Sequence, residues 1–125
     1  MLALAGFALQ ASADVTYTLL SATKTNNNEG AEKLLDGQGS TKWGEGLNNG
    51  DTRWIVFKAS AGIMPSDYVL TVANDTPGSK GRQWQKWRIY GANFASDVSA
   101  TRNADGWVLL DSKENITDEE FPTGT

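Results

Sequence analysis

Short apolar stretches alternate with polar, turn-forming stretches along this chain of 125 residues. Residues 15–19 alternate apolar and polar side chains, which is typical of a half-buried strand. Residues 53–58 form a continuous apolar run of strand length that is rich in β-branched and aromatic residues. By these criteria the pattern predicts five strands, at residues 15–19, 53–58, 67–73, 84–90 and 106–110.

The period of two also predicts which side chains share a face of a strand. The expected sets are Tyr68 with Leu70 and Val72, Trp87 with Ile89, and Trp107 with Leu109. Four tryptophans lie beside other apolar residues at strand-like spacing, so we expect them to pack in the core: Trp43, Trp54, Trp87 and Trp107.

Residues 29–35 have the pattern of one short helix. Asn28 is positioned to cap its first turn, and Gly37 lies near its end. The small and apolar side chains Ala31, Leu34 and Leu35 would then face the core.

Five short strands, one short helix and long turn-rich loops predict an all-β sandwich whose loops form the functional surface. Sandwiches of this kind usually have about seven strands or more. We therefore expect a single domain over residues 14–125 that lacks its last strands, with a compact five-stranded fold as the alternative.

The first 13 residues have the pattern of a secretory signal peptide. An apolar run at residues 2–9 (LALAGFAL) is followed by the cleavage-like sequence QASA at residues 10–13. The run is too short to span a bilayer, and no Lys or Arg precedes it. We expect an incomplete leader over residues 1–13 and a protein that is secreted, periplasmic or at the cell surface. A buried strand or helix is the alternative.

Composition excludes several classes of chemistry. The net charge of −4 argues against a partner with a phosphate backbone, which needs a basic surface. The chain has no His and no Cys, which removes the triads and dyads that use them, the usual zinc sites and disulfides. Five tryptophans supply flat apolar faces that can pack in a core or stack on a ligand.

The order of motifs resembles one known family. LLDG and STKW at residues 34–43 are followed by RWIVF, YVLTVAND, WRIYGAN and GWVLLD. This series resembles the coagulation factor 5/8 type C, or discoidin-like, domains, and most of all the bacterial modules grouped with family 32 carbohydrate-binding modules. The resemblance covers about Thr16 to Phe121.

The resemblance implies a jelly-roll β-sandwich of the galactose-binding type that is non-catalytic, often binds a structural Ca²⁺ and carries its sugar site on loops. Such modules are usually attached to secreted glycan-processing enzymes or surface proteins. Some sugar-binding members have an Arg after the strand that corresponds to residues 67–73, and the matching position here is Asn74.

The loop LLDGQGSTKW is the candidate calcium site. Ca²⁺ takes six to eight oxygen ligands, and a tight loop with glycines lets several carbonyls converge. Asp36 would provide the charge and Thr41 a further oxygen, with the carbonyls of Leu34, Gly39 and Ser40 completing the shell. The alternative is that Asp36 only caps a turn and Thr41 begins a strand.

The turn-rich segment from residue 74 to residue 84 is the candidate sugar site. Trp84 could stack on the apolar face of a pyranose, and Asn74, Asp75 and Arg82 could bond to its hydroxyl groups. Glu45 is a further candidate at the rim. A solvated turn and a buried Trp84 would explain the same residues.

The sequence therefore predicts an exported, non-catalytic glycan-binding module, covalently attached to a catalytic or surface domain, without nucleic-acid binding or membrane insertion. One alternative is a protein-interaction or structural module on the same fold, because a fold does not fix its ligand. A small glycoside hydrolase is the other. It would need two carboxyl groups held across a cleft, and the carboxylates here occur in turn-like contexts.

Overall fold

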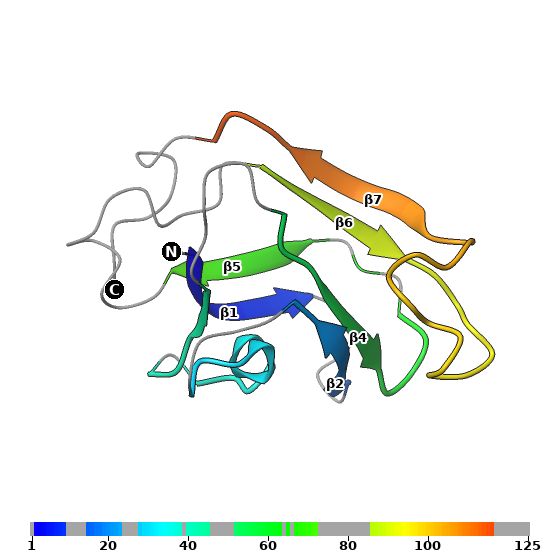
Figure 1. Ribbon diagram of the computed structural model, residues 1–125, viewed down its shortest axis with the longest axis horizontal. Helices are drawn as coiled ribbons and strands as arrows, with labels where there is room; N and C mark the ends of the chain where they lie inside the picture. The colour runs from blue at the N-terminus through cyan, green and yellow to red at the C-terminus, as the bar shows by residue number, and fades with distance from the viewer. Residues whose placement is uncertain are drawn as a thin grey trace.

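The computed structural model describes residues 2–9, 15–23, 28–38, 40–45, 52–63, 65, 67–72 and 86–116, and these residues form an all-β structure with almost no helix. The elements are β1 (Leu2–Leu9), β2 (Tyr17–Ala22), the short 3₁₀ helix η1 (Ala31–Leu34), β3 (Trp43–Glu45), β4 (Ile55–Ala59), β5 (Tyr68–Val72), β6 (Trp87–Gly91) and β7 (Val108–Lys113). Figure 1 shows their arrangement.

The strands form small antiparallel sheets. One sheet has the order β3-β1-β5, a second consists of β2 and β4, and a third of β6 and β7. In the view of Figure 1 the third, a hairpin, lies above the β1–β5 pair, and β4 crosses the right-hand end of that pair, with β2 beside its lower end. The long loop from residue 92 to residue 107 joins β6 to β7.

Each of the five predicted strands exists, and each end is displaced by one to three residues from its predicted position. Residues 15–19, 53–58, 67–73, 84–90 and 106–110 contain parts of β2, β4, β5, β6 and β7 respectively. The structure adds β1 and β3, so the described residues contain seven strands rather than five. The predicted number, on which the expectation of missing strands depended, was therefore two too low.

The predicted faces are correct for β6 and wrong for β7. In β6, Trp87 and Ile89 are half-buried, whereas their neighbours are exposed. In β7, Val108, Leu109 and Leu110 are 61%, 51% and 51% exposed. The register shifts between Ile89 and Tyr90, opposite Leu110, so an extra residue breaks the period of two. Within the described residues β7 pairs only with β6, and no further strand covers it.

The predicted helix is shorter and differently capped than expected. It is one 3₁₀ turn, and its N-cap is Gly30, with no side-chain capping bond. Asn28 has φ 57°, a left-handed backbone conformation outside the helix, so the prediction that it caps the first turn was wrong. The chain leaves the helix through Gly37, whose φ of 72° favours glycine.

The core joins the short helix to two of the sheets. Ala31, Leu34 and Trp43 are 2%, 2% and 1% exposed and form one buried cluster. The half-buried side chains packed on it come from β2, β4, β5 and the end of η1: Leu19, Ala22, Leu35, Ile55 and Leu70. The predictions that Leu34 faces the core and that Trp43 packs in it are confirmed. No helix of the described residues is long and apolar enough to cross a membrane.

Residues 2–9, predicted as the apolar part of a leader, form β1. This strand lies between β3 and β5, with Leu4 opposite Trp43 on one side and Phe7 opposite Leu70 on the other. A strand is the alternative that the sequence left open for this segment. Removal of the leader in the cell stays a prediction, and it would separate β3 and β5 from the strand that joins them.

Candidate functional site

The loop predicted to bind calcium is closed by its own side chains. One carboxylate oxygen of Asp36, Oδ1, accepts a hydrogen bond from the backbone N–H of Gln38 (2.9 Å). The other, Oδ2, accepts one from the hydroxyl of Thr41 (2.7 Å). The N–H of Thr41 donates to the carbonyl of Gln38 (3.3 Å). The structure thus brings Asp36 and Thr41 together, in the arrangement of a capped turn.

The same contacts set the charge of Asp36. Partial burial acts to raise the pKa of its carboxyl group, but hydrogen bonds from Thr41 and Gln38 and the positive charge of Lys33 hold that pKa below its ordinary value. Asp36 is therefore ionised at neutral pH and already engaged with the loop.

The contacts of this loop are those of the capped turn that the sequence left open as the alternative. Ca²⁺ sites usually combine several carboxylates with carbonyl oxygens. Within the described residues no group of three or more acidic side chains could hold a metal ion. Leu34 is buried and Ser40 is exposed. Gly39 lies outside the described residues. Calcium binding by this loop stays a proposal.

The predicted sugar-binding side chains are not part of the described structure. Asn74, Asp75, Arg82 and Trp84 lie outside the described residues. Glu45 ends β3, and its side chain is also outside the description. Their proposed role therefore stays a prediction from the sequence.

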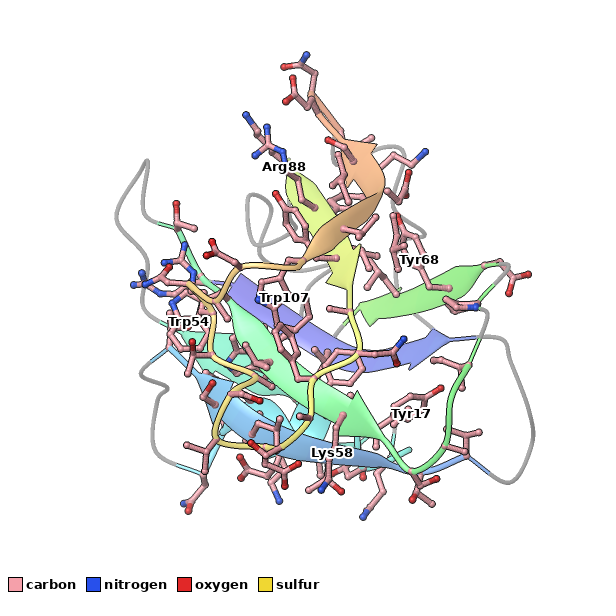
Figure 2. The ribbon with its side chains drawn as sticks, turned by 90° about the vertical axis from the view of Figure 1, so that its right-hand side faces the viewer. Tyr17, Trp54, Lys58, Tyr68, Arg88 and Trp107 are labelled. Carbon is pink, nitrogen blue, oxygen red and sulfur yellow. The ribbon has the colours of Figure 1, made fainter. Side chains whose placement is uncertain are left out.

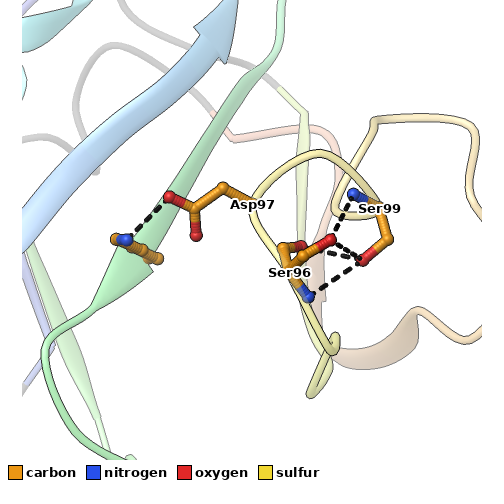
Figure 3. A network of polar contacts seen from close by, with 4 residues as sticks. Ser96, Asp97 and Ser99 are labelled. Atoms are coloured by element: carbon orange, nitrogen blue, oxygen red, sulfur yellow. Dashed lines mark hydrogen bonds and ion pairs between the residues drawn. The ribbon is translucent and has the colours of Figure 1, made fainter.

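A second loop, residues 92–107, is attached to β4 by an ion pair. Lys58 Nζ on β4 lies 2.7 Å from Asp97 Oδ2, and both side chains are about half exposed. Next to Asp97, Ser96 and Ser99 bond to each other: Ser99 Oγ donates to the Ser96 carbonyl (2.8 Å), and Ser99 N–H to Ser96 Oγ (3.3 Å). Figure 3 shows this compact turn beside β4.

The second half of the same loop is also fixed by hydrogen bonds. The Thr101 carbonyl accepts one bond from the Trp107 indole N–H (3.0 Å) and another from the Ala104 N–H (3.1 Å). Trp107 also packs edge-to-face on Phe94, with ring centroids 4.9 Å apart. Trp107 thus holds a turn in place, rather than lying on a strand face with Leu109 as predicted. Figure 2 shows it within the curve of the loop.

That turn presents Arg102 to Trp54. The guanidinium carbon of Arg102 lies 5.5 Å from the centroid of the Trp54 ring, which is within the range of a cation–π contact. Trp54 is half-buried and Arg102 is exposed. The sequence pattern predicted that Trp54 packs in the core. Nothing in the local pattern pairs residues 48 positions apart, so only the fold reveals this contact.

A chain of polar groups joins β5 to the β6–β7 hairpin. The Trp87 indole N–H donates to Tyr68 Oη (2.9 Å), and the Tyr68 hydroxyl donates to Asp111 Oδ2. Burial raises the pKa of Tyr68 above its ordinary value, and donation to Asp111 and its negative charge act in the same direction, against the bond from Trp87. The bond from Tyr68 lowers the pKa of Asp111, as do the Ser112 backbone and Lys113, against a smaller effect of burial.

Replacement of Tyr68 by Phe should destabilise the protein and flatten its pH profile. We expect a loss of about 1–2 kcal/mol of unfolding free energy at pH 7, since the hydroxyl bridges two partners. The lowered pKa of Asp111 gives stability that is present above about pH 4 and is lost as the pH falls through the folded-state pKa. The raised pKa of Tyr68 gives stability that is present below about pH 10 and is lost as the pH rises through it.

Urea unfolding of the wild type and Tyr68→Phe at pH 3, 7 and 11 measures this effect. The difference between the two proteins should be largest at pH 7 and smaller at both extremes. Tyr17→Phe is the matched control. Tyr17 packs edge-to-face on Phe57, and both belong to the β2–β4 sheet, which does not contain Tyr68. A difference for Tyr68→Phe that does not change with pH would show that the polar chain does not link β5 to the hairpin.

No family model, curated protein or solved structure matches this chain.

Proposed function

We propose that this chain is a non-catalytic glycan-binding module with a jelly-roll sandwich of the galactose-binding type. The observation that carries the proposal is that long loops hold polar and aromatic side chains in fixed positions on an antiparallel frame. The clearest case is residues 92–107, where an ion pair and an indole hydrogen bond hold the loop and place Arg102 over Trp54. Aromatic faces beside fixed hydrogen-bonding groups are suited to sugars.

Binding at a single site should be weak. Hydrogen bonds between a sugar and a protein largely replace bonds between the sugar and water, so each contributes little net free energy. Attachment to a catalytic or surface domain would compensate, because a tethered module acts at a high effective concentration on a polymeric ligand. The order of motifs that resembles discoidin-like domains supports this arrangement.

The proposal places the module outside the cytoplasm. The support is the apolar run and cleavage-like sequence of residues 1–13. N-terminal sequencing of protein recovered from the medium or periplasm tests it. A mature chain that begins at Asp14 would support the leader, whereas an intact N-terminus would support β1 as a permanent strand.

Binding is favoured over hydrolysis by the contacts of the described carboxylates. Asp36 closes its own loop, Asp97 pairs with Lys58, and Asp111 accepts from Tyr68. A glycoside hydrolase needs two carboxyl groups that face a cleft at a set separation. Activity on a panel of chromogenic glycosides that disappears in Asp36→Ala would contradict the proposal.

A structural calcium ion at the Asp36 loop is part of the proposal, with weak affinity. Extracellular modules often bind Ca²⁺ with dissociation constants of about 10⁻⁴–10⁻³ M. At about ten times the dissociation constant, calcium would stabilise the fold by about 1.4 kcal/mol. Calcium at ~10 mM is ten times a dissociation constant of ~1 mM. We expect it to raise the melting temperature of the wild type by several degrees and to leave that of Asp36→Asn unchanged.

Thermal melts in calcium, in magnesium and in a chelator measure this directly. Asp97→Asn is the matched control, because it removes the same charge from an exposed ion pair elsewhere. Equal melting temperatures of the wild type in all three buffers would show that the Asp36 loop holds no structural calcium ion.

A protein-interaction module is the second candidate, because one surface favours it. The β6–β7 hairpin exposes four large apolar or aromatic side chains, Tyr90, Val108, Leu109 and Leu110, each about half exposed or more. Exposed apolar patches of this kind often mark interaction sites. Pull-down partners that depend on Leu109 would favour this candidate over glycan binding.

Binding to a panel of immobilised glycans tests the leading proposal, with Trp84→Ala as the site variant. If Trp84 stacks on a pyranose, Trp84→Ala should weaken binding by about two- to tenfold, since an aromatic contact is worth about 0.5–1.5 kcal/mol beyond its buried area. Tyr90→Ala is the matched control, because Tyr90 is an exposed aromatic residue on the hairpin. Unchanged binding by Trp84→Ala would remove Trp84 from the site.

A further inference from the structure

We propose that Trp54 and Arg102 form a subsite for a sugar residue that carries a carboxylate, such as a uronic or a sialic acid. This inference rests on the proposed glycan-binding function and names the class of ligand. The contact that motivates it is the guanidinium of Arg102, 5.5 Å from the centre of the Trp54 ring. Figure 2 shows Trp54 at the edge of the molecule, close to the loop that carries Arg102.

Arg102 has the chemistry of a carboxylate receptor. A guanidinium has five N–H donors in a planar fork that matches the two oxygens of a carboxylate. The side chain of Arg102 is exposed, and it makes no ion pair with an acidic residue in the described part of the chain. By contrast Arg88, which is also exposed, lies 3.4 Å from Glu114. The donors of Arg102 are therefore available to a ligand.

The backbone at both members of the pair is held by hydrogen bonds before a ligand arrives. Arg102 follows Thr101, whose carbonyl is fixed by Trp107 and Ala104 (3.0 and 3.1 Å). The carbonyl of Trp54 accepts the backbone N–H of Thr23 on the adjacent segment (3.1 Å). Groups that are fixed in advance lose less conformational entropy on binding, which favours a specific subsite.

The neighbouring groups complete a surface suited to an acidic sugar. Trp54 is half-buried and its ring lies next to the guanidinium, so a ligand bound to Arg102 would lie close to the indole. Asn103, the next residue of the turn, is exposed and could bond to hydroxyl groups. Lys58 and Asp97 on the same side pair with each other, so they add no net charge to the subsite.

The test compares ligands and variants in solution. Binding of oligogalacturonate, sialyllactose and neutral lactose is measured by calorimetry for the wild type, Arg102→Gln, Arg102→Lys and the control Arg88→Gln, with a melting curve for each protein. We expect at least one acidic ligand to bind more tightly than lactose. Arg102→Gln should weaken that ligand about tenfold or more, and Arg102→Lys should recover only part of the loss because it lacks the planar fork.

The outcomes separate this inference from the proposed function. A preference for oligogalacturonate identifies a uronate subsite, and a preference for sialyllactose identifies a sialic acid subsite. Binding of lactose alone, or equal binding of acidic ligands by the wild type and Arg102→Gln, would overturn the subsite and leave glycan binding intact. A lower melting temperature for Arg102→Gln with unchanged acidic-ligand binding would assign the pair to stability alone. No binding to any glycan on a wide panel would overturn the proposed function itself.

Discussion

Replacement of Trp43 by Ala should cost about 3–5 kcal/mol of unfolding free energy, the largest loss expected for a single side chain of the described core. Trp43 is 1% exposed and packs with Ala31 and Leu34. The half-buried side chains around it come from β2, β4 and β5, so its indole fills the space between η1 and two sheets. A typical domain has only about 5–15 kcal/mol of stability in total, so much of it would be lost.

Urea unfolding followed by circular dichroism measures this loss. Trp107→Ala is the matched control, because Trp107 is a half-buried tryptophan of the loop that packs on Phe94. We expect the control to lose clearly less stability than Trp43→Ala. If the two variants were equally destabilised, or if Trp43→Ala lost less than about 1 kcal/mol, the cluster at Trp43 would not be the main core.

If β1 is a permanent strand of the domain, a chain that begins at Asp14 should lose cooperative unfolding or melt far below the full chain. It lacks β1, which pairs with β3 through Leu4 and with β5 through residues up to Leu9. Without β1 the strands β3 and β5 have no shared neighbour among the described residues, and the backbone groups on their facing edges lose their hydrogen-bond partners. Exposed strand edges also promote aggregation.

Thermal melts and dye binding to exposed apolar surface compare the two chains. A synthetic peptide of residues 1–13, added to the shortened chain, should restore part of the lost stability, whereas a peptide of the same composition in scrambled order should not. An unchanged melting temperature of the shortened chain would instead favour the leader interpretation of residues 1–13.

The sequence pattern predicted five of the strands and missed two others, β1 and β3. The strands β2, β4, β5, β6 and β7 all contain β-branched or aromatic runs that the local pattern reveals. β3 has only three residues, WGE, and its pairing with β1 is a tertiary property. β1 has an apolar run that a leader, a helix and a buried strand share, so the pattern alone could not distinguish among them.

Side-chain faces were predictable on β6 and not on β7, which carries the extra residue of their shared ladder. In β6 the alternation of Trp87 and Ile89 with exposed neighbours follows from the sequence. In β7 the bulge at Leu110 displaces the face, and a bulge depends on the partner strand rather than on the local sequence. The predicted cap of η1 was also wrong, because the helix begins at Ala31 with Gly30 as its N-cap. Asn28 lies two residues before that position, in a left-handed conformation.

The candidate site was predictable in part. The proximity of Asp36 and Thr41 followed from their spacing around two glycines, and the structure brings them together. The contacts of Trp54 with Arg102 and of Lys58 with Asp97 join a strand to a distant loop, and local patterns carry no information about such pairs. The polar chain from Trp87 through Tyr68 to Asp111 was missed for the same reason.

Glycan binding is tested most directly by a binding measurement on the full chain at high ligand density, where avidity compensates for weak single sites. We expect saturable binding to at least one class of glycan, competed by the free sugar, with no release of product from the same glycans over hours. Absence of binding to every glycan on a broad panel, by protein that melts cooperatively, would contradict it.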